Sequence, residues 1–492
     1  MHISDIFAVQ PLERGGDTPL FRQLYARIKE AILNGTLGPG IRLPPTRALC
    51  CMLAVSRQTV LNAYDQLMAE GYLNGTVGRG TFVSACLPIA PALPGAAPQG
   101  LMRPLSARGM AYAGAMGKVG FHQGARRAFR VSMPGLDLFP FDIWSRLEAR
   151  RWRRPDHHMG YSDPAGFAPL RELLCVYLRA ARGVNCTPEQ IVITSGSQQG
   201  LYLLASLLLA PGDKVWVESP GYQGAGAPLF AVGAKVCTVP VDEQGMDVAY
   251  GASCYPDARM VFSTPSHQLP LGVTMSLQRR LELLRWAAAS KAWIIEDDYD
   301  SEYRYNGPPL ASLQSLDSAG CTVYVGTMSK VLFPGLRLGY IVAPPALVEP
   351  VVRAKAVLDR HNAIVPQMVL ADFMAEGHFG RHIRRTRQAY GERREALLSG
   401  IERHLAGELR CGPTDTGLDL CVFLRRRLDD EAVAQAALAR GLELRPLSYY
   451  ASRVATPECA VDPGLLLGFA AVTPVEIASA VKLLAKVLRA MT

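Results

Sequence analysis

The chain has 492 residues, of which 49% are hydrophobic and 19% are charged, so it is long enough for two or three globular domains and is neither fibrous nor disordered. Its longest apolar run, 201–210, is too short to span a bilayer, and no basic-then-apolar signal pattern opens the sequence. The formal net charge of +9 permits a nucleic-acid partner without demonstrating one.

The cysteines give a further bound on the class of protein. There are 11 of them, scattered without any C-x-x-C spacing. Such a pattern favours reduced thiols in a cytoplasmic protein over disulfides, and it predicts no metal site.

The first predicted element is an amphipathic helix from about residue 20. Leu20, Leu24 and Ile28 recur at intervals of four residues, and Asn34-Gly35 is a plausible stop. A short helix is then expected over 46–53, with Thr46 as its N-cap, and a longer helix opens at Ser56. Two helices joined by a turn of about three residues are typical of a helix-turn-helix.

The segment 72–83 alternates apolar and polar residues around a Gly-Arg-Gly, which predicts a two-stranded wing. In a helix-turn-helix the first residues of the second helix reach base edges in the major groove, where arginine reads guanine and glutamine reads adenine. Arg47 would then hold a phosphate, and Arg79 at the wing tip would reach the minor groove or the backbone. The alternative is a small helical domain that binds protein. The predicted base-contacting residues are Ser56, Arg57, Gln58 and Thr59.

Residues 85–130 are rich in proline, alanine and glycine and then become basic, which predicts a linker. Further arginines follow up to residue 154. The favoured interpretation is that these arginines form the solvated face of a helix. The alternative is that they make auxiliary contacts to DNA phosphates.

A strand is expected over 190–194, followed by a Gly/Ser turn that opens an apolar helix. A turn of this kind is a phosphate cradle, because the free N–H groups of a helix N-terminus point at the anion. The residues predicted to form the cradle are Gly196, Ser197 and Gln198.

The most informative stretch runs from Trp293 to Tyr340. Its apolar runs 293–295 and 322–325 read as buried strands that stop before polar residues, and ligands of open α/β sheets bind past the carboxyl ends of the strands. Acidic side chains and Lys330 are therefore expected to meet in one crevice. The alternative for Lys330 is a solvated surface charge.

A lysine can form a Schiff base with an aldehyde, and pyridoxal 5'-phosphate (PLP) is the usual aldehyde cofactor. Its ring nitrogen requires a carboxylate, here Asp297, and its phenolic oxygen would be reached by Tyr299. Its phosphate requires hydroxyls and an arginine. The predicted donors are Thr327, Ser329 and Arg337.

The wording D-D-Y-D-S-E and S-K-x-L-F-P-G-L-R-L-G-Y, with Lys330 31 positions after Tyr299, resembles the MocR regulators, within the fold-type I PLP enzymes. The first 83 residues resemble the GntR-type winged helix in G-x-L-x-P-G-x-R-L-P, V-S-R-Q-T-V and G-R-G-T-F-V. The resemblance implies a homodimer, with Tyr222 stacked on the pyridine ring and Tyr161 reaching the phosphate of the neighbouring subunit.

At two positions the sequence departs from the pattern of the catalytic aminotransferases that it resembles. Leu269 stands where catalytic aminotransferases carry an asparagine, so Ser266 or His267 is expected to substitute. Near Leu466, amino-acid-processing relatives carry an arginine that clamps the substrate carboxylate. Both departures favour PLP itself, or a small vitamer, as the signal over an amino acid that is transaminated.

The sequence therefore predicts an α/β protein with four parts: a winged helix over 1–84, a linker over 85–130, a large aminotransferase-like PLP domain over 131–348 and a small α+β part over 349–492. We expect a DNA-binding transcription regulator that uses PLP as effector or as effector-sensing cofactor, with vitamin B6 or amino-acid metabolism as a possible target. The alternatives are a PLP-dependent aminotransferase with an accessory DNA-binding domain, and a cofactor-free dimerisation scaffold.

Overall fold

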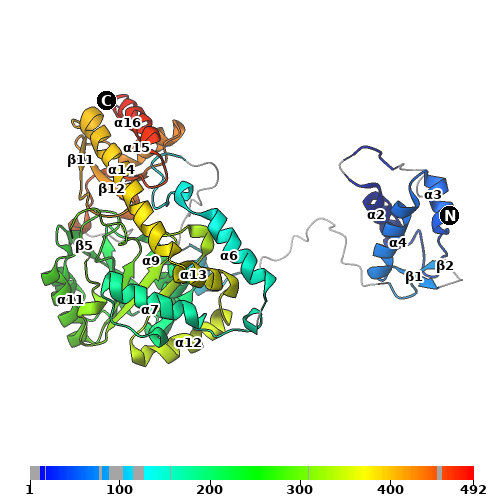
Figure 1. Cartoon of the computed structure of the whole chain (residues 1–492), viewed down its shortest axis with the longest axis horizontal. Coiled ribbons are helices and arrows are strands. Elements are labelled where there is room, and N and C mark those ends of the chain that lie inside the picture. The colour runs from blue at the N-terminus through cyan, green and yellow to red at the C-terminus, as the bar shows by residue number, and fades with distance from the viewer. Residues whose placement is uncertain are drawn as a thin grey trace. The chain divides into compact units, whose positions relative to one another are not determined.

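The computed structural model describes residues 12–16, 18–76, 80–87, 104–114, 127–155, 157–307, 310–451 and 457–491. It divides into two compact units, Met1–Pro104 and Leu105–Thr492 (Figure 1).

The smaller unit is a helix-turn-helix with a hairpin. Its elements are α2 (Leu20–Leu33), α3 (Thr46–Leu53), α4 (Arg57–Ala69), β1 (Leu73–Thr76) and β2 (Gly80–Val83). The predicted winged helix is confirmed, but Thr46 is not an N-cap: Pro45 holds that position and Thr46 begins the helix. The two strands pair antiparallel, with Leu73 opposite Val83.

The core of this unit is a cluster of leucines and other apolar side chains from all three helices and the hairpin, including Leu24, Leu49 and Leu67, each fully buried. A polar contact also joins α2 to α4. Lys29 on α2 forms a 2.7 Å ion pair with Glu70 at the end of α4. The Tyr25 hydroxyl donates to the same carboxylate.

The larger unit is built on an eight-stranded sheet of order β3-β10-β9-β8-β7-β4-β5-β6. The neighbours from β9 to β5 are parallel, whereas β10 runs antiparallel to both β3 and β9, and β6 antiparallel to β5. The strands are β3 (Ile191–Thr194), β4 (Lys214–Ser219), β5 (Lys235–Asp242), β6 (Gly245–Met246), β7 (Met260–Ser263), β8 (Trp293–Asp298), β9 (Thr322–Thr327) and β10 (Gly339–Val342).

Helices cover both faces of this sheet, as expected for buried parallel strands (Figure 1). One face packs on α8 (Ser197–Leu208), α9 (Gln223–Val232) and α12 (Pro345–Asp359). The other face packs on α6 (Phe141–Arg153), α7 (Ala168–Arg182), α10 (Val248–Cys254), α11 (Leu277–Ser290) and α13 (Ile364–Ala375).

The long helix α14 (His378–Leu405) then leads the chain from this layered part to the C-terminal part (Figure 1). There a four-stranded antiparallel sheet of order β11-β12-β14-β13 packs against α14 and two further helices. The elements are β11 (Leu409–Cys411), β12 (Asp419–Leu424), α15 (Asp430–Ala439), β13 (Arg445–Pro446), β14 (Gly464–Gly468) and α16 (Pro474–Arg489).

Two described segments within the range predicted as a linker belong to the larger unit. Helix α5 (Ala107–Gly114) lies on α9, where the Arg108 guanidinium donates to the Ala231 carbonyl at 2.9 Å. Phe129 is fully buried and bridges Gly468 of the small sheet. Short 3-10 turns complete the unit at 136–138, 157–159, 188–190, 314–316, 334–336, 447–450 and 457–459. None of the described helices is long and apolar enough to cross a membrane.

Because each unit has its own core, damage to one should leave the other intact. Leu67→Ala creates a cavity in the helix-turn-helix core and is expected to destabilise that unit by about 2–5 kcal/mol. Thermal unfolding followed by calorimetry should show one transition moving down while the transition of the larger unit stays in place. A single transition that shifts as a whole would contradict independent cores.

Candidate cofactor site and nucleic-acid interface

The predicted crevice lies where β8 and β9 end side by side. Strand β8 runs further than predicted, through Asp298, because Asp297 and Asp298 pair in register with Val325 and Gly326 of β9. The acids thus lie within the strand end and not beyond it. Lys330 follows the end of β9 by three residues.

Lys330 is partly buried at these strand ends and is not a fully solvated surface charge. Its Nζ donates a 2.8 Å hydrogen bond to the carbonyl of Ser132. Burial lowers the pKa of Lys330, while the nearby carboxylates Asp419, Asp300 and Asp297 oppose that shift. A lysine with a lowered pKa is deprotonated more readily, as a nucleophilic amine must be.

Asp297 is a buried carboxylate whose Oδ1 has no hydrogen-bond partner among the described residues. Burial raises its pKa to about 7, Asp298 adds to the shift and Lys330 opposes it. An unpartnered carboxylate oxygen at this depth is costly unless a donor meets it. The group is therefore suited to a protonated ring nitrogen.

Tyr299 lies beside a histidine–carboxylate pair. His267 Nδ1 is 3.0 Å from the Tyr299 hydroxyl and 2.9 Å from Asp300 Oδ1. Burial lowers the pKa of His267, but Asp300 more than offsets it, so the net shift is upward. Of the two residues expected to replace the missing asparagine, only His267 reaches Tyr299, because the Ser266 hydroxyl accepts from Arg182.

The predicted phosphate cradle is assembled at the start of α8. Gly196 is the N-cap with φ 86°, and a Cβ there would lie 3.1 Å from the Arg337 guanidinium, so a glycine permits this close approach. Arg337 itself donates to the Ser195 carbonyl at 2.9 Å. Ser197 is the first residue of α8, and the N–H groups in the first turn of a helix have no partner within that helix.

Tyr222 faces the same space from the end of β4. Its hydroxyl accepts from the Gln198 side chain at 3.0 Å. Burial raises the pKa of Tyr222 to about 12, and Asp297 adds to the shift while Arg337 opposes it. Thr327 and Ser329 close the opposite turn, where the Thr327 hydroxyl donates to the Ser329 hydroxyl at 3.1 Å.

A second layer behind the cradle was not predicted. Asn362 donates to the Ser195 hydroxyl, and Asp359 accepts from Gln199 at 2.6 Å and from the fully buried Lys355 at 2.9 Å. These residues come from α12 and the turn after it, and no local sequence motif predicts their role. Their contacts fix the turn that contains Gly196.

Ser132 and Asp419 were also missed. The Ser132 N–H donates to Asp419 Oδ1 at 2.8 Å, and Asp419 is the first residue of β12 in the small sheet. Burial raises the pKa of Asp419 to about 6. Asp300 was visible in the D-D-Y-D-S-E wording, whereas nothing in the sequence around Asp419 links it to Lys330.

The two departures at Leu269 and Leu466 meet in space. Both are buried in one apolar cluster with Val131 and Tyr450, and Tyr222 and Tyr299 pack against that cluster. The site is therefore bordered by an apolar wall where the sequence comparison led us to look for an arginine.

Tyr161 does not reach Lys330 within this chain. Its side chain is 84% exposed, and its ring lies 5.2 Å from the Arg360 guanidinium. An exposed aromatic side chain that stands beside the cradle helices is available to a second copy of the chain.

The predicted DNA-contacting residues cluster on the exposed start of α4. Ser56 is the N-cap, since its hydroxyl accepts from the Thr59 N–H at 3.0 Å, so these two side chains shape the helix end. Arg57 and Gln58 are exposed there, and Gln58 donates to Asn62. Arg47 is exposed on α3. Arg79 lies outside the described residues.

The basic cluster on α6 is partly internal. Arg150 and Arg151 both form ion pairs with Asp372 on α13, at 2.9 and 2.5 Å. Arg146 and Arg153 are exposed or half-buried at the surface.

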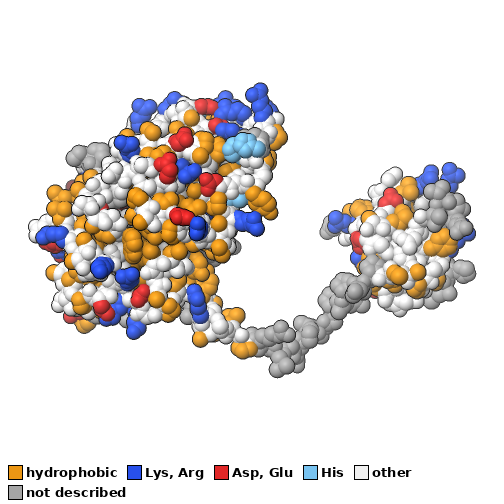
Figure 2. All heavy atoms as spheres, turned by 90° about the horizontal axis from the view of Figure 1, so that it is seen from below, with side chains coloured by type: hydrophobic (Ala, Val, Ile, Leu, Met, Phe, Trp, Pro, Cys, Tyr) orange, Lys and Arg blue, Asp and Glu red, His pale blue; other side chains and the backbone are white. Residues whose placement is uncertain are grey.

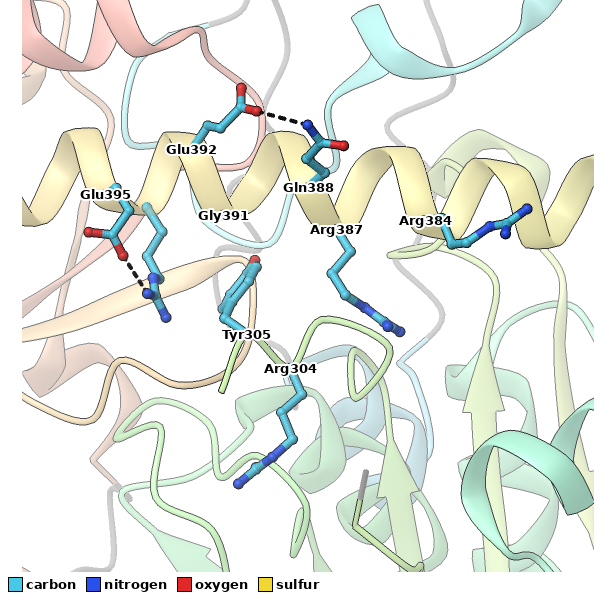
Figure 3. Close-up of a pocket in the computed structure, with 9 residues that line it drawn as sticks. Arg304, Tyr305, Arg384, Arg387, Gln388, Gly391, Glu392 and Glu395 are labelled. Atoms are coloured by element: carbon cyan, nitrogen blue, oxygen red, sulfur yellow. Dashed lines mark hydrogen bonds and ion pairs between the residues drawn. The ribbon is translucent and has the colours of Figure 1, made fainter. Parts of the chain in front are cut away.

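A separate open pocket of about 520 Å³ lies along α14 (Figure 3). Figure 3 shows Arg387 extending from the helix toward the loop that carries Arg304 and Tyr305. No lysine is among the described residues that line it, so this pocket does not suit an aldehyde cofactor. The lining residues are Arg304, Tyr305, Arg384, Arg387, Gln388, Gly391, Glu392, Arg394 and Glu395.

Comparisons with known proteins assign a family to each of the two units. The family model for aminotransferase class I and II matches residues 148–484, and that for bacterial regulatory proteins of the gntR family matches residues 20–83. The chain is 39% identical to a probable rhizopine catabolism regulatory protein MocR of Rhizobium meliloti, over 94% of this chain and 92% of that protein. It is 32% identical to a pyridoxine biosynthesis transcriptional regulator PdxR of Corynebacterium glutamicum, over 92% of each.

Among solved structures, a Pyrococcus horikoshii kynurenine aminotransferase in complex with PMP superposes with a TM-score of 0.67 at 28% identity, covering 74% of this chain and 90% of that one. Fold and comparisons together define a helix-turn-helix transcription regulator joined to an aminotransferase-like domain of the kind whose structural relatives bind PLP or PMP. The chain belongs to the MocR-like regulators of the GntR family.

The raised pKa of Asp297 has a consequence for stability. The folded, cofactor-free protein keeps this proton up to pH about 7, whereas an unfolded chain releases it near pH ~4. The free energy of unfolding should therefore fall as pH rises through that window. Asp297→Asn removes the titrating group and is expected to reduce the fall by on the order of 2–4 kcal/mol.

Urea unfolding of the cofactor-free protein between pH 4.5 and 8 measures this difference. Glu349→Gln, which removes an exposed carboxylate paired with Arg353, is the matched control and should keep the slope of the unaltered protein. An unchanged slope in Asp297→Asn would contradict the assignment.

Proposed function

We propose that this regulator binds PLP in the Lys330 crevice and uses the loaded domain to sense its signal. The observation that carries the proposal is the partly buried Lys330 just past the strand ends that hold the buried carboxylate Asp297, whose Oδ1 has no hydrogen-bond partner among the described residues. These are the two groups that an aldehyde-bearing pyridinium ring requires, and the proposed phosphate cradle contains Gly196, which permits the close approach of Arg337.

Each residue then has a defined task. Lys330 supplies the amine that bonds to the cofactor aldehyde, and Asp297 holds the proton on the ring nitrogen. Tyr299 donates toward the phenolic oxygen, with His267 and Asp300 fixing its position. When bound, the group acts as an electron sink for a bonded amine.

The cradle and the aromatic residue complete the proposed site. Gly196, Ser197 and Gln198 offer backbone and side-chain donors to the phosphate, while Thr327, Ser329 and Arg337 approach from the other side. Tyr222 is held by Gln198 for stacking on the ring.

A homodimer is part of the proposal. Figure 2 shows apolar side chains gathered over much of one face of the larger unit. Tyr161 and Val357 are 84% and 90% exposed, so both side chains are available to a second copy of the chain. Tyr161 would reach the phosphate of the partner's cradle, and two winged helices would read paired half-sites.

Neither relative's name fixes the regulated pathway. One is named for rhizopine catabolism and the other for pyridoxine biosynthesis. We propose that loading of the Lys330 site changes operator affinity, since a ligand enriches only the state that binds it better.

Borohydride reduction of PLP-loaded protein should fix the cofactor on Lys330 irreversibly. Peptide mapping should find the adduct on the Lys330 peptide, and Lys330→Ala should lose the visible absorbance band. Lys482→Ala is the control, since that lysine is exposed on α16. An adduct on any other lysine would overturn the site.

Arg57 and Arg47 are expected to differ in how their loss affects DNA binding. Loss of a bidentate base contact in Arg57→Ala should cost about 1–3 kcal/mol and relax specificity at one position. Loss of a phosphate contact in Arg47→Ala should weaken all sequences alike and flatten the salt dependence. Binding to a library of operator variants, with Arg22→Ala as a charge-matched control, separates the two. Identical specificity profiles would refute the assignment.

A further inference from the structure

The open pocket along α14 carries more positive than negative charge. Four arginines and two glutamates are among the described residues that line it, which leaves a formal charge of +2. Its volume of about 520 Å³ lies within the range of ~300–1,000 Å³ that is usual for small-molecule sites. The residues assigned to the proposed cofactor site are not among the described residues of this lining, so the pocket is a separate place on the larger unit.

Two arginines on the helix side of the pocket lack a carboxylate partner. Arg384 and Arg387 are three residues apart on α14, so their side chains leave neighbouring positions on one face of the helix. Both are exposed, and neither forms an ion pair with any of the described residues. The Arg387 Nε donates to the Glu302 carbonyl at 2.8 Å, which leaves its two terminal nitrogens for a ligand.

Two further arginines of the lining keep buried nitrogens without a hydrogen-bond partner among the described residues. These nitrogens are Nε of Arg394, which is only 8% exposed, and Nε and Nη1 of Arg304. The other nitrogens of Arg394 are used, because Nη1 donates to the Thr414 carbonyl at 2.8 Å and Nη2 pairs with Glu395. Buried donors without an acceptor are costly, so an acceptor supplied by a ligand is favoured here.

The walls of the pocket are fixed to each other by contacts behind them. The Thr386 hydroxyl on α14 lies 3.3 Å from the Tyr303 hydroxyl on the opposite loop. The Tyr305 hydroxyl donates to the Gly417 carbonyl at 2.8 Å, and the Arg394 guanidinium lies 4.8 Å from the centre of the Tyr305 ring. Because the walls are held in place in this way, a ligand has little protein to order when it binds.

The same pocket offers an apolar surface beside the charges. The Tyr305 ring lines the pocket, and Gly391 on α14 faces that ring without a side chain (Figure 3). A Cβ at Gly391 would lie 3.8 Å from Tyr305 Cδ1, which is an ordinary contact distance. A ligand can therefore place a ring or a short carbon group here while its charged end meets the arginines.

A phosphate group fits this arrangement better than a carboxylate or a nucleic acid. A phosphate monoester carries nearly two negative charges at neutral pH and three acceptor oxygens, which matches Arg384 and Arg387, whereas a carboxylate brings one charge. Duplex nucleic acid carries a charge about every 1.7 Å along its axis. It would also meet Glu392 and Glu395, which border the pocket and are exposed.

We infer that the pocket along α14 is a second ligand site, which takes a small phosphate monoester with a compact ring or carbon group. Arg384 and Arg387 bind the phosphate, and Tyr305 contacts the ester group. The inference is independent of the proposed function, because it uses no group of the Lys330 crevice.

The test titrates the full chain by calorimetry with phenyl phosphate and with benzoate, which has the same ring and a single charge. PLP is first fixed on the protein with borohydride and free cofactor is removed, so that the cradle near Lys330 is filled. One phenyl phosphate should bind per chain, about tenfold or more tightly than benzoate. If no PLP is fixed, the proposed function fails alone, and the variants still locate the phenyl phosphate site.

Arg387→Gln should weaken phenyl phosphate binding by about tenfold or more, because it removes a charged donor. Arg403→Gln is the matched control and should bind as the unaltered protein does, since Arg403 is exposed on the same helix and is not among the lining residues. Gly391→Leu fills the pocket without changing its charge and should weaken binding by a similar factor. Gly380→Leu, at an exposed position of α14 with open space around it, should leave binding unchanged.

Four outcomes would overturn the inference. The first two are absence of phenyl phosphate binding and equal or tighter binding of benzoate. Equal weakening by Arg387→Gln and Arg403→Gln would show attraction to the general surface charge and not a site. If Arg387→Gln weakens binding of duplex DNA while the chain takes up no phenyl phosphate, this face contacts nucleic acid and the small-ligand assignment is wrong.

Discussion

The partly buried Lys330 is the constraint on which the arrangement of the larger unit depends. An ammonium with little water around it is tolerated only near carboxylates and carbonyls, and here the Ser132 carbonyl accepts from it while Asp297, Asp300 and Asp419 lie near enough to oppose the lowering of its pKa. These groups come from the segment before α6, the end of β8 with the residues after it, and the first residue of β12. Enclosing one amine thus ties the small sheet to the large one.

The same burial sets the balance of charges in the proposed cofactor site. Asp297 and Asp419 have raised pKa values because burial disfavours their charge, and Lys330 has a lowered one for the same reason. Whatever enters the crevice changes this balance of charges. Because Asp419 belongs to β12 and Asp297 to β8, such a change acts on the junction between the two sheets.

The winged helix is organised by simpler physics. Its core consists of apolar side chains at helical spacing, and its DNA-facing helix is started by Ser56 with Arg57 and Gln58 exposed beyond it. Helical spacing and capping residues can both be recognised within a short run of consecutive residues. The helices at 46–53 and from 57 were therefore predicted almost to the residue, and only the N-cap role of Thr46 was wrong.

The sequence alone determined both family motifs and where strands β8 and β9 begin, because each depends on neighbours within a few positions. Only the tertiary structure brought His267 to Tyr299, Ser132 to Lys330, 198 positions apart, and Ser132 to Asp419, 287 positions apart. Such contacts depend on how two sheets are joined. The spacing of residues along the chain does not predict how the sheets are joined, so polar contacts between distant residues could be identified only in the folded structure.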